Sequence, residues 1–353
     1  MLKTRRFWLG AAFSIVLLGL FFWRVDIRET ASALKNANYV WIIPGVAIYF
    51  VSVMFRALRW HFLLRPLKHV SPRRLYPVII VGYMANNLLP VRLGELVRSF
   101  FLGHREGVSK SATLATIILE RVFDGVGLLI IALVVWPFLP VHDILRDFSD
   151  GTGVPVVLLI LAVVGPFVVV LTLFFAAGVY PALGRRMVAL LVLFVPRALK
   201  PSVESVAMKF LDGLTSIRSP KRIIAMMLLT FPIWFAEGTM YWLISFGFEI
   251  DQPFHGMMLI TSTSNLATSL PSTAGGVGPF EYATRVTLES LDTAAAAAAA
   301  FAIVLHVALL APVTVVGLVV LWMENLSLGE LTRRPVSGLV EGYEASSASQ
   351  AES

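Results

Sequence analysis

The sequence predicts an all-α polytopic membrane protein with about six transmembrane helices and two re-entrant helical hairpins in an inverted repeat. The first reason is composition: 57% of the 353 residues are hydrophobic and 14% are charged, whereas about 25% of the residues of a typical soluble protein are charged. The second reason is a pair of proline- and glycine-broken segments at corresponding places in the two halves of the chain. These features place the chain in a bilayer and indicate two related halves.

The first broken segment follows an apolar run that is too short to cross a bilayer. The run Tyr76–Leu89 would form a helix of roughly 21 Å, whereas the hydrocarbon core is about 30 Å thick. Pro90 has no N–H group with which to continue the helix, and Gly94 adds backbone freedom. We therefore expect a re-entrant hairpin, which membranes tolerate only where protein or a water-filled cavity surrounds it.

A second segment repeats this pattern about half a chain later. Its proline is Pro271, and the apolar run before it, residues 255–270, is again short for a crossing. Three glycines follow this proline, namely Gly275, Gly276 and Gly278. Paired broken helices in two halves are typical of transporters, whose binding sites lie between the repeats. The alternative interpretation is two proline-kinked helices with ordinary structural ion pairs.

The apolar runs that we assign as crossings are residues 7–23, 39–55, 111–139, 154–178, 223–248 and 294–323. The first begins with basic residues, like a signal peptide, but lacks the small residues that a cleavage site requires. We therefore expect an uncleaved first span, followed by a short mixed-charge connection at residues 24–38. The run at 111–139 carries Glu120, Arg121 and Asp124, so these charges lie within the span or at its edge.

The distribution of Lys and Arg predicts the orientation of the chain. These residues concentrate at 56–74 and 185–222, which we place in the cytoplasm together with both termini. Residues 143–150 and 249–251 are acidic and are expected outside. The chain is therefore predicted to be an integral multi-pass protein of the plasma (inner) membrane.

The domain organisation follows from this topology. The predicted parts are a single transmembrane domain at 1–324 with halves at about 39–140 and 223–323, a cytoplasmic amphipathic segment at 180–222 and a disordered cytoplasmic tail at 325–353. The amphipathic segment has apolar residues at helical spacing from Val203 to Leu214, so it either lies on the membrane or docks against the bundle. The tail is rich in Ser, Ala and Glu.

Three motifs resemble those of a known family: Leu89-Pro90-x-Arg92-x-Gly94-Glu95-x-x-Arg98, Glu120-Arg121-x-x-Asp124, and Pro271-x-x-x-Gly275-Gly276-x-Gly278-x-x-Glu281. They are similar to segments of the lysylphosphatidylglycerol synthase transmembrane-region family, which includes UPF0104-type proteins. The resemblance implies a flippase-like domain over about residues 41–322. Ala274 departs from the family pattern, which usually has proline there. Because no soluble aminoacyl transferase domain follows, we do not expect lysine transfer.

The candidate substrate-binding residues lie in or near the broken segments and the charged spans. They are Asn87, Arg92, Glu95, Arg98, Glu120, Arg121, Asp124, Glu237, Glu281 and Arg285. An unpaired charge at the centre of a bilayer costs about 2.5 to 3.5 kcal/mol, so these groups must converge on partners or water. Arginines match phosphate groups, and we expect Arg98 and Glu95, three residues apart on one helix face, to act as a pair.

These observations predict a transporter of an anionic, phosphate-bearing lipid, either a phospholipid or a polyprenyl-phosphate derivative. The alternatives are an integral-membrane transferase or hydrolase and an accessory subunit of a cell-envelope enzyme. We identify no catalytic residues, metal site or cofactor, because the chain has no cysteine and its six histidines are scattered. The expected partner is a membrane lipid and not nucleic acid; a cell-envelope enzyme or a second copy of the chain is a candidate protein partner.

Overall fold

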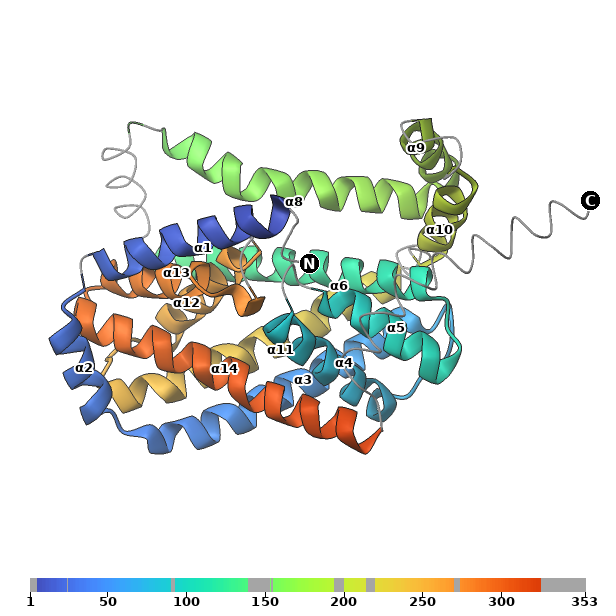
Figure 1. The fold of residues 1–353 in the computed structure, drawn as a ribbon. Coiled ribbons are helices and arrows are strands. Elements are labelled where there is room, and N and C mark those ends of the chain that lie inside the picture. The colour runs from blue at the N-terminus through green and yellow to red at the C-terminus, as the bar shows by residue number, and fades with distance from the viewer. Residues whose placement is uncertain are drawn as a thin grey trace, which may run out of the picture.

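The computed structural model describes residues 5–23, 25–89, 93–138, 153, 155–193, 200–213, 220–269 and 274–324. All regular structure in these ranges is helical (Figure 1). Three of the described helical segments are long and apolar enough to cross a membrane, namely Tyr39–Leu64, Lys221–Phe248 and Ala295–Met323. The predicted all-α membrane fold is therefore confirmed, whereas the count of six crossings and the re-entrant nature of the hairpins stay predictions.

The first half of the chain contains α1 (Arg5–Trp23), α2 (Ile27–Asn36), η1 (Tyr39–Trp41), α3 (Ile42–Leu64), α4 (Pro72–Leu88), α5 (Gly94–Glu106), α6 (Lys110–Val135) and η3 (Trp136–Phe138). The short mixed-charge connection expected at residues 24–38 contains the α2 helix. Asp26 caps it, because its side chain accepts hydrogen bonds from the backbone N–H groups of Arg28 and Glu29.

The second half contains α8 (Val156–Val179), α9 (Pro181–Leu193), α10 (Lys200–Gly213), α11 (Pro220–Ser245), η6 (Phe246–Phe248), α12 (Phe254–Ala267), η7 (Ala274–Gly276), α13 (Pro279–Glu289) and α14 (Ala295–Met323). Several predicted features lie outside the described residues. They are Pro90, Arg92, Pro271, the acidic segment 143–150 and the tail at 325–353.

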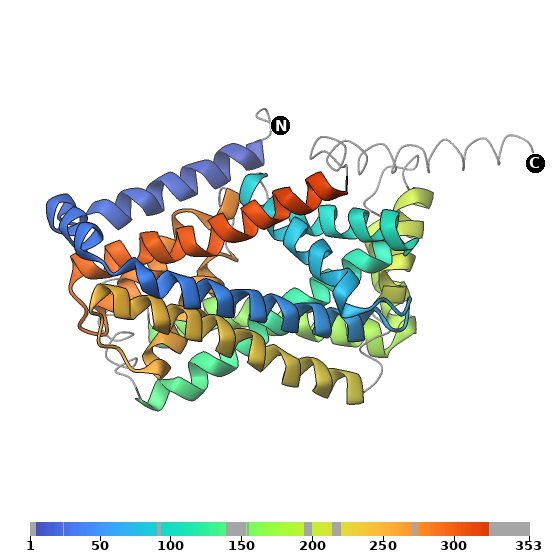
Figure 2. The same cartoon turned by 90° about the horizontal axis from the view of Figure 1, so that it is seen from below.

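The packing of the two halves follows an inverted repeat. α4 packs on α5 as α12 packs on α13, and α5 contacts α6 as α13 contacts α14. Across the halves, α4 packs on α14 as α12 packs on α6. The corresponding helices α3 and α11 lie side by side (Figure 2). They run antiparallel, because Gly45 lies against Ile244 whereas Arg59, further along α3, bonds Thr230, which is earlier on α11.

The outside of the bundle is apolar and its inside carries charge, as a membrane requires. Large side chains such as Ile43, Leu133 and Trp322 are exposed, while Arg59 and Glu120 are completely buried. This burial corrects the sequence analysis, which assigned Arg56 and Arg59 to a cytoplasmic basic block. α3 continues past the expected end of the second span, to Leu64, and carries both arginines into the interior.

Helices α8, α9 and α10 lie outside the central bundle (Figure 1). α8 contacts α9 and α6, and α10 contacts α9 and α6. Phe210 and Leu211 of α10 pack against the main hydrophobic core. The amphipathic segment therefore docks against the bundle through α10, which was one of the two alternatives for it.

Candidate functional site

The first hairpin, α4–α5, is held together by close backbone contact. The Gly94 N–H donates to Asn86 Oδ1 at 2.8 Å, and Asn86 Nδ2 donates to Glu95 Oε1 at 3.2 Å. A Cβ atom on Gly94 would lie 2.1 Å from the carbonyl oxygen of Gly82, and one on Gly82 would lie 2.1 Å from Arg98 Cγ. Gly94 therefore permits the close approach of α4 and α5, beyond the backbone freedom expected of it.

The second hairpin, α12–α13, turns through left-handed glycines. Gly275, Gly276 and Gly278 have φ values of 74°, 79° and 100°, which residues with a Cβ atom rarely adopt. The Gly278 N–H donates to Glu281 Oε2 at 2.7 Å, so this glutamate caps the first turn of α13. A Cβ atom on Gly278 would also lie 2.8 Å from the backbone of Ser14 on α1.

The ends of the two hairpins meet beside the middle of α14. Asn87, at the end of α4, donates to Thr314 Oγ1 at 3.0 Å and to the Leu310 carbonyl oxygen at 3.3 Å. Gly275 of the second hairpin lies against Leu310 and against the Asn87 carbonyl oxygen. Both hairpins therefore converge on one short stretch of α14.

An ion-pair network lies at the crossing of α3 and α11. Arg56 Nη2 donates to Glu237 Oε2 at 2.7 Å, and Arg56 Nη1 lies 3.5 Å from Asp124. Glu237 follows Arg56 along the chain by the same interval as Pro271 follows Pro90. The two side chains occupy corresponding positions of the halves and touch each other, so their contact lies on the approximate two-fold axis.

The network continues from α3 to α6 and α5. Arg59 contacts Asp124 at 2.8 Å and Glu120 at 3.3 Å, so the two carboxylates share a helix face as their i,i+4 spacing predicts. Arg98 Nη2 donates to Glu120 Oε2 at 3.0 Å, and its guanidinium group stacks over Trp60 at 4.2 Å. These side chains are almost completely buried.

The network ends at Arg121, which is less buried. Arg121 lies 3.7 Å from Glu95 and 3.7 Å from Asp124, and its side chain is 37% exposed. The expected pair of Glu95 with Arg98 is therefore replaced by Glu95 with Arg121 and Arg98 with Glu120. The network has equal numbers of arginines and carboxylates, so its formal charges cancel: Arg56, Arg59, Arg98, Arg121, Glu95, Glu120, Asp124 and Glu237.

A cavity of about 590 Å³ lies between this network and the hairpin ends. Its lining includes these sequence-predicted residues: Asn87, Glu95, Arg121, Asp124, Glu237 and Gly275. The lining also includes these residues that the sequence analysis did not select: Tyr49, Arg56, Tyr83, Asn86, Trp234, Asn265, Thr268, Ser269, Phe280 and His306. Charged, amide and aromatic groups from both halves therefore face one space.

Four lining side chains carry a buried donor that has no hydrogen-bond acceptor among the described residues. These atoms are Arg56 Nε, Tyr83 Oη, Arg121 Nε and Trp234 Nε1. They are close together, since the Arg56 guanidinium carbon lies 4.8 Å from the centre of the Trp234 ring, and the guanidinium carbons of Arg56 and Arg121 each lie 5.8 Å from the centre of the Tyr83 ring. Buried donors are normally satisfied, so a bound polar group or water would complete this set.

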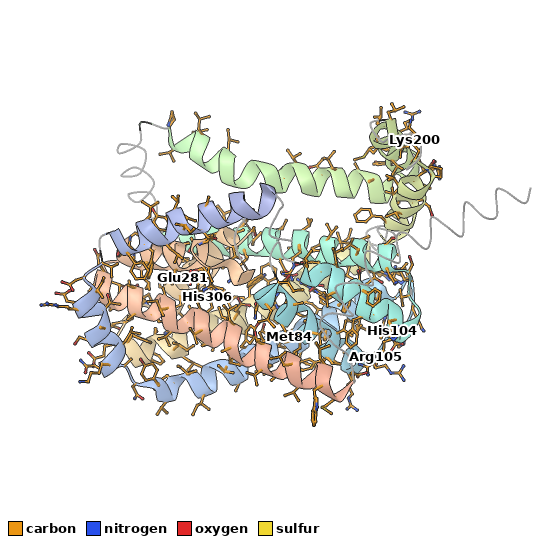
Figure 3. The ribbon with its side chains drawn as sticks, viewed as in Figure 1. Met84, His104, Arg105, Lys200, Glu281 and His306 are labelled. Carbon is orange, nitrogen blue, oxygen red and sulfur yellow. The ribbon has the colours of Figure 1, made fainter. Side chains whose placement is uncertain are left out.

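Four of the candidate residues that the structure describes are not part of the cavity lining. Arg98 and Glu120 lie behind it in the ion-pair network. Glu281 accepts a hydrogen bond from the Gly278 N–H group. Glu281 also lies beside His306 (Figure 3). Arg285 donates to the Phe21 carbonyl oxygen at 2.6 Å and lies 3.4 Å from Glu289, so it anchors the end of α1. Direct contact of these residues with a substrate stays a prediction.

The sequence held a signal for some of the missed residues. The number of residues from Pro90 to Pro271 equals that from Arg56 to Glu237. The internal symmetry therefore relates Arg56, which the sequence analysis did not select, to Glu237, which it did. His306 is a single histidine within the last apolar run, and the sequence analysis had no reason to select it from among the six scattered histidines. No group of three or more acidic or histidine side chains in the described part of the chain could hold a metal ion.

Comparison with known proteins agrees with this architecture. The model of the lysylphosphatidylglycerol synthase transmembrane region matches residues 7–317. The chain belongs to this family. The resemblance inferred from the three motifs is thus confirmed, and the match spans all helices of both hairpins. No solved structure was found to match the chain.

Several curated proteins are similar to the chain over much of its length. A UPF0104 membrane protein of Methanothermobacter thermautotrophicus is 24% identical over 71% of this chain and 75% of its own length. PH1989 of Pyrococcus horikoshii, another UPF0104 membrane protein, is 22% identical over 75% of this chain and 81% of its own length. The glycosyltransferase AglD of Haloferax volcanii is 28% identical over 87% of this chain, but the match spans 52% of AglD.

Proposed function

We propose that the protein translocates an anionic, phosphate-bearing membrane lipid by alternating access. The observation that carries this proposal is the cavity at the meeting point of the two hairpins, lined by charged groups from both halves. In transporters built from inverted repeats, the substrate site lies near the midplane at the repeat interface, where broken helices meet. The headgroup would enter this cavity while the acyl or prenyl tail stays in the lipid.

The donors that line the cavity favour a phosphate group. Arg56 and Arg121 offer forked guanidinium groups, which match phosphate oxygens, and the donors of Tyr83 and Trp234 lie beside Arg56. The carboxylates Asp124 and Glu237 hold Arg56 in place. An arriving phosphate would compete with these carboxylates for the Arg56 guanidinium group.

A second candidate function is lipid modification by an integral-membrane transferase or hydrolase. The name of AglD, a glycosyltransferase, favours it, although the match spans about half of that protein. In such a reaction Asp124 or Glu237 would act as acid or base. An accessory role for a cell-envelope enzyme is a third candidate, and binding to such an enzyme without any movement of lipid would support it.

Purified protein in liposomes distinguishes these functions. The liposomes carry a fluorescent phosphatidylglycerol or phosphatidylcholine, and a membrane-impermeant quencher reports how much of each lipid lies in the outer leaflet. We expect the protein to accelerate exchange of the anionic lipid more than that of the zwitterionic lipid. Mass spectrometry of the same lipids, showing conversion without exchange between leaflets, would contradict transport and support an enzyme.

Two arginine variants make this test specific to the cavity. Arg121→Gln removes a cavity cation whose ion pairs are long, at 3.7 Å, and whose side chain is 37% exposed. Arg105→Gln is the matched control, because Arg105 is 32% exposed and pairs with Glu324, away from the cavity. Since a hydrogen bond to a charged group contributes about 1.5 to 3 kcal/mol, Arg121→Gln should slow exchange roughly tenfold or more, and Arg105→Gln should not.

A further inference from the structure

His306 has an oxygen acceptor at each ring nitrogen. Nδ1 lies 2.6 Å from Glu281 Oε1, and Nε2 lies 3.0 Å from the carbonyl oxygen of Gly275. A neutral imidazole has one N–H group, and a backbone carbonyl cannot donate. Both hydrogen bonds therefore form only if the ring carries two protons or if Glu281 is itself protonated. In either form the pair holds one proton more than neutral histidine with an ionised glutamate.

This proton holds the end of the second hairpin in place. Gly275 is a left-handed residue beside Leu310 and Asn87, since a Cβ atom added to it would lie 3.2 Å from Leu310 Cδ1 and 4.0 Å from the Asn87 carbonyl oxygen. Glu281 fixes the next turn by accepting a hydrogen bond from the Gly278 N–H group. If the proton leaves, one nitrogen of the His306 ring has no hydrogen, and it faces either the Glu281 carboxylate or the Gly275 carbonyl oxygen. One of the two hydrogen bonds is lost, and the contact of η7 with α14 weakens.

The first half has a corresponding contact in which the cation is an arginine. Glu95 and Glu281 both lie in the first turn of the second hairpin helix of their half. Glu95 pairs with Arg121 on α6, and Glu281 pairs with His306 on α14. The number of residues from Arg121 to His306 nearly equals the number from Glu95 to Glu281. Arginine stays charged at any physiological pH, whereas histidine changes its charge in that range. The two halves thus carry one permanent and one titratable version of the same contact.

The surroundings of His306 leave its proton within reach of the cavity. From α13 the carboxylate of Glu281 faces the ring, and the Phe280 ring stacks on it at 4.3 Å. The other titratable or charged groups that share the cavity with His306 come from α3, α4, α5, α6 and α11: Tyr49, Arg56, Tyr83, Glu95, Arg121, Asp124 and Glu237. The charged residues of α2, which also packs on α14, are exposed: Asp26, Arg28, Glu29 and Lys35.

We propose that His306 and Glu281 form a proton-binding site that couples the movement of lipid to a proton gradient. This inference rests on the proposed transport function and names its co-substrate. The protonated pair holds the second hairpin against α14, and release of the proton to the cavity frees the hairpin. The step binds and releases one proton and changes no other covalent bond. Proton occupancy would then decide when the second hairpin can open.

The first experiment follows the hairpin without any lipid assay. The chain contains no cysteine, so Ser269→Cys, on the cavity wall beside the second hairpin, introduces a single thiol. Modification of this thiol, corrected for thiol ionisation, should become faster as pH rises. At pH values where most molecules hold the proton, each decrease of one pH unit should lower the rate of thiol modification about tenfold, because one proton controls opening. In the same background His306→Arg should abolish this dependence, and His104→Gln, which changes an exposed histidine, should not.

The second experiment measures proton flux into liposomes with a trapped pH-sensitive dye during lipid exchange. We expect a proton flux that His306→Arg removes and His104→Gln keeps. If lipid moves but neither thiol modification nor proton flux depends on His306, this proposal is wrong and the transport function stands. If lipid does not move but modification still titrates through His306, the proton site stands and the transport function fails.

Discussion

A buried ion pair between Arg56 and Glu237 joins the two halves of the molecule. Their side chains are about 4% exposed and 2.7 Å apart, and Asp124 is the second partner of Arg56. Such a pair gains little over an apolar pair, but loss of one partner leaves an unpaired buried charge. The contact therefore specifies how α3 and α11 align more than it adds to stability.

A double-mutant cycle tests this coupling. Removal of one partner of a buried ion pair costs about 3 to 5 kcal/mol, so Arg56→Met and Glu237→Gln should each lower the unfolding temperature in detergent markedly. Arg56→Met/Glu237→Gln should lose less stability than the sum of the two single variants, because neither charge is then left alone. Strictly additive losses would show that the two side chains do not depend on each other.

The residues of this network also show where sequence reasoning fails. The spacing of three residues favoured a pair of Glu95 with Arg98, but Arg98 reaches Glu120, which lies 22 residues away on α6. Local spacing describes one helix surface, whereas partners in a packed bundle come from other helices. Arg56 looked cytoplasmic because many basic residues follow it, and its burial depends on where α3 ends.

At the scale of elements, the hairpins were predictable because proline and glycine act locally. Pro90 and Pro271 indicated where the chain must turn, and the glycines of the second hairpin adopt the left-handed conformations that only glycine adopts readily. The α2 helix was missed because its cap, Asp26, stands in a short mixed-charge stretch. The docking of α10 could not be predicted, since an amphipathic helix suits a membrane surface equally well.

Substitution of Gly94 tests the packing of the first hairpin. Gly94→Ala places a Cβ atom 2.1 Å from the Gly82 carbonyl oxygen, so α4 and α5 must separate. Overpacking of this kind costs about 1 to 3 kcal/mol, and we expect a lower unfolding temperature and slower lipid exchange.

Gly165→Ala is the matched control for Gly94→Ala. A Cβ atom there meets nothing within 4 Å in the described residues, and alanine stabilises a helix by about 0.5 to 1 kcal/mol relative to glycine. Equal stability losses in the two variants would contradict the close crossing of α4 and α5.

At the scale of the whole molecule, the distribution of Lys and Arg predicts a definite orientation in the membrane. We expect Ser205, which is exposed on α10, to face the cytoplasm, and Asp251, before α12, to face outward. In intact cells an impermeant thiol reagent should label Asp251→Cys and leave Ser205→Cys unlabelled until the membrane is opened. The reverse pattern of labelling would show that the topology is inverted.

The central claim is that lipid headgroups pass through the cavity between the hairpins. A bulky thiol reagent, attached in detergent to Ser269→Cys on the cavity wall, tests it directly by filling this space before reconstitution into liposomes. The control is Ser205→Cys on α10, modified to the same extent. We predict that the modified Ser269→Cys protein no longer exchanges the fluorescent anionic lipid, while the unmodified protein and the modified control still do. Undiminished exchange by fully modified Ser269→Cys protein would contradict the account.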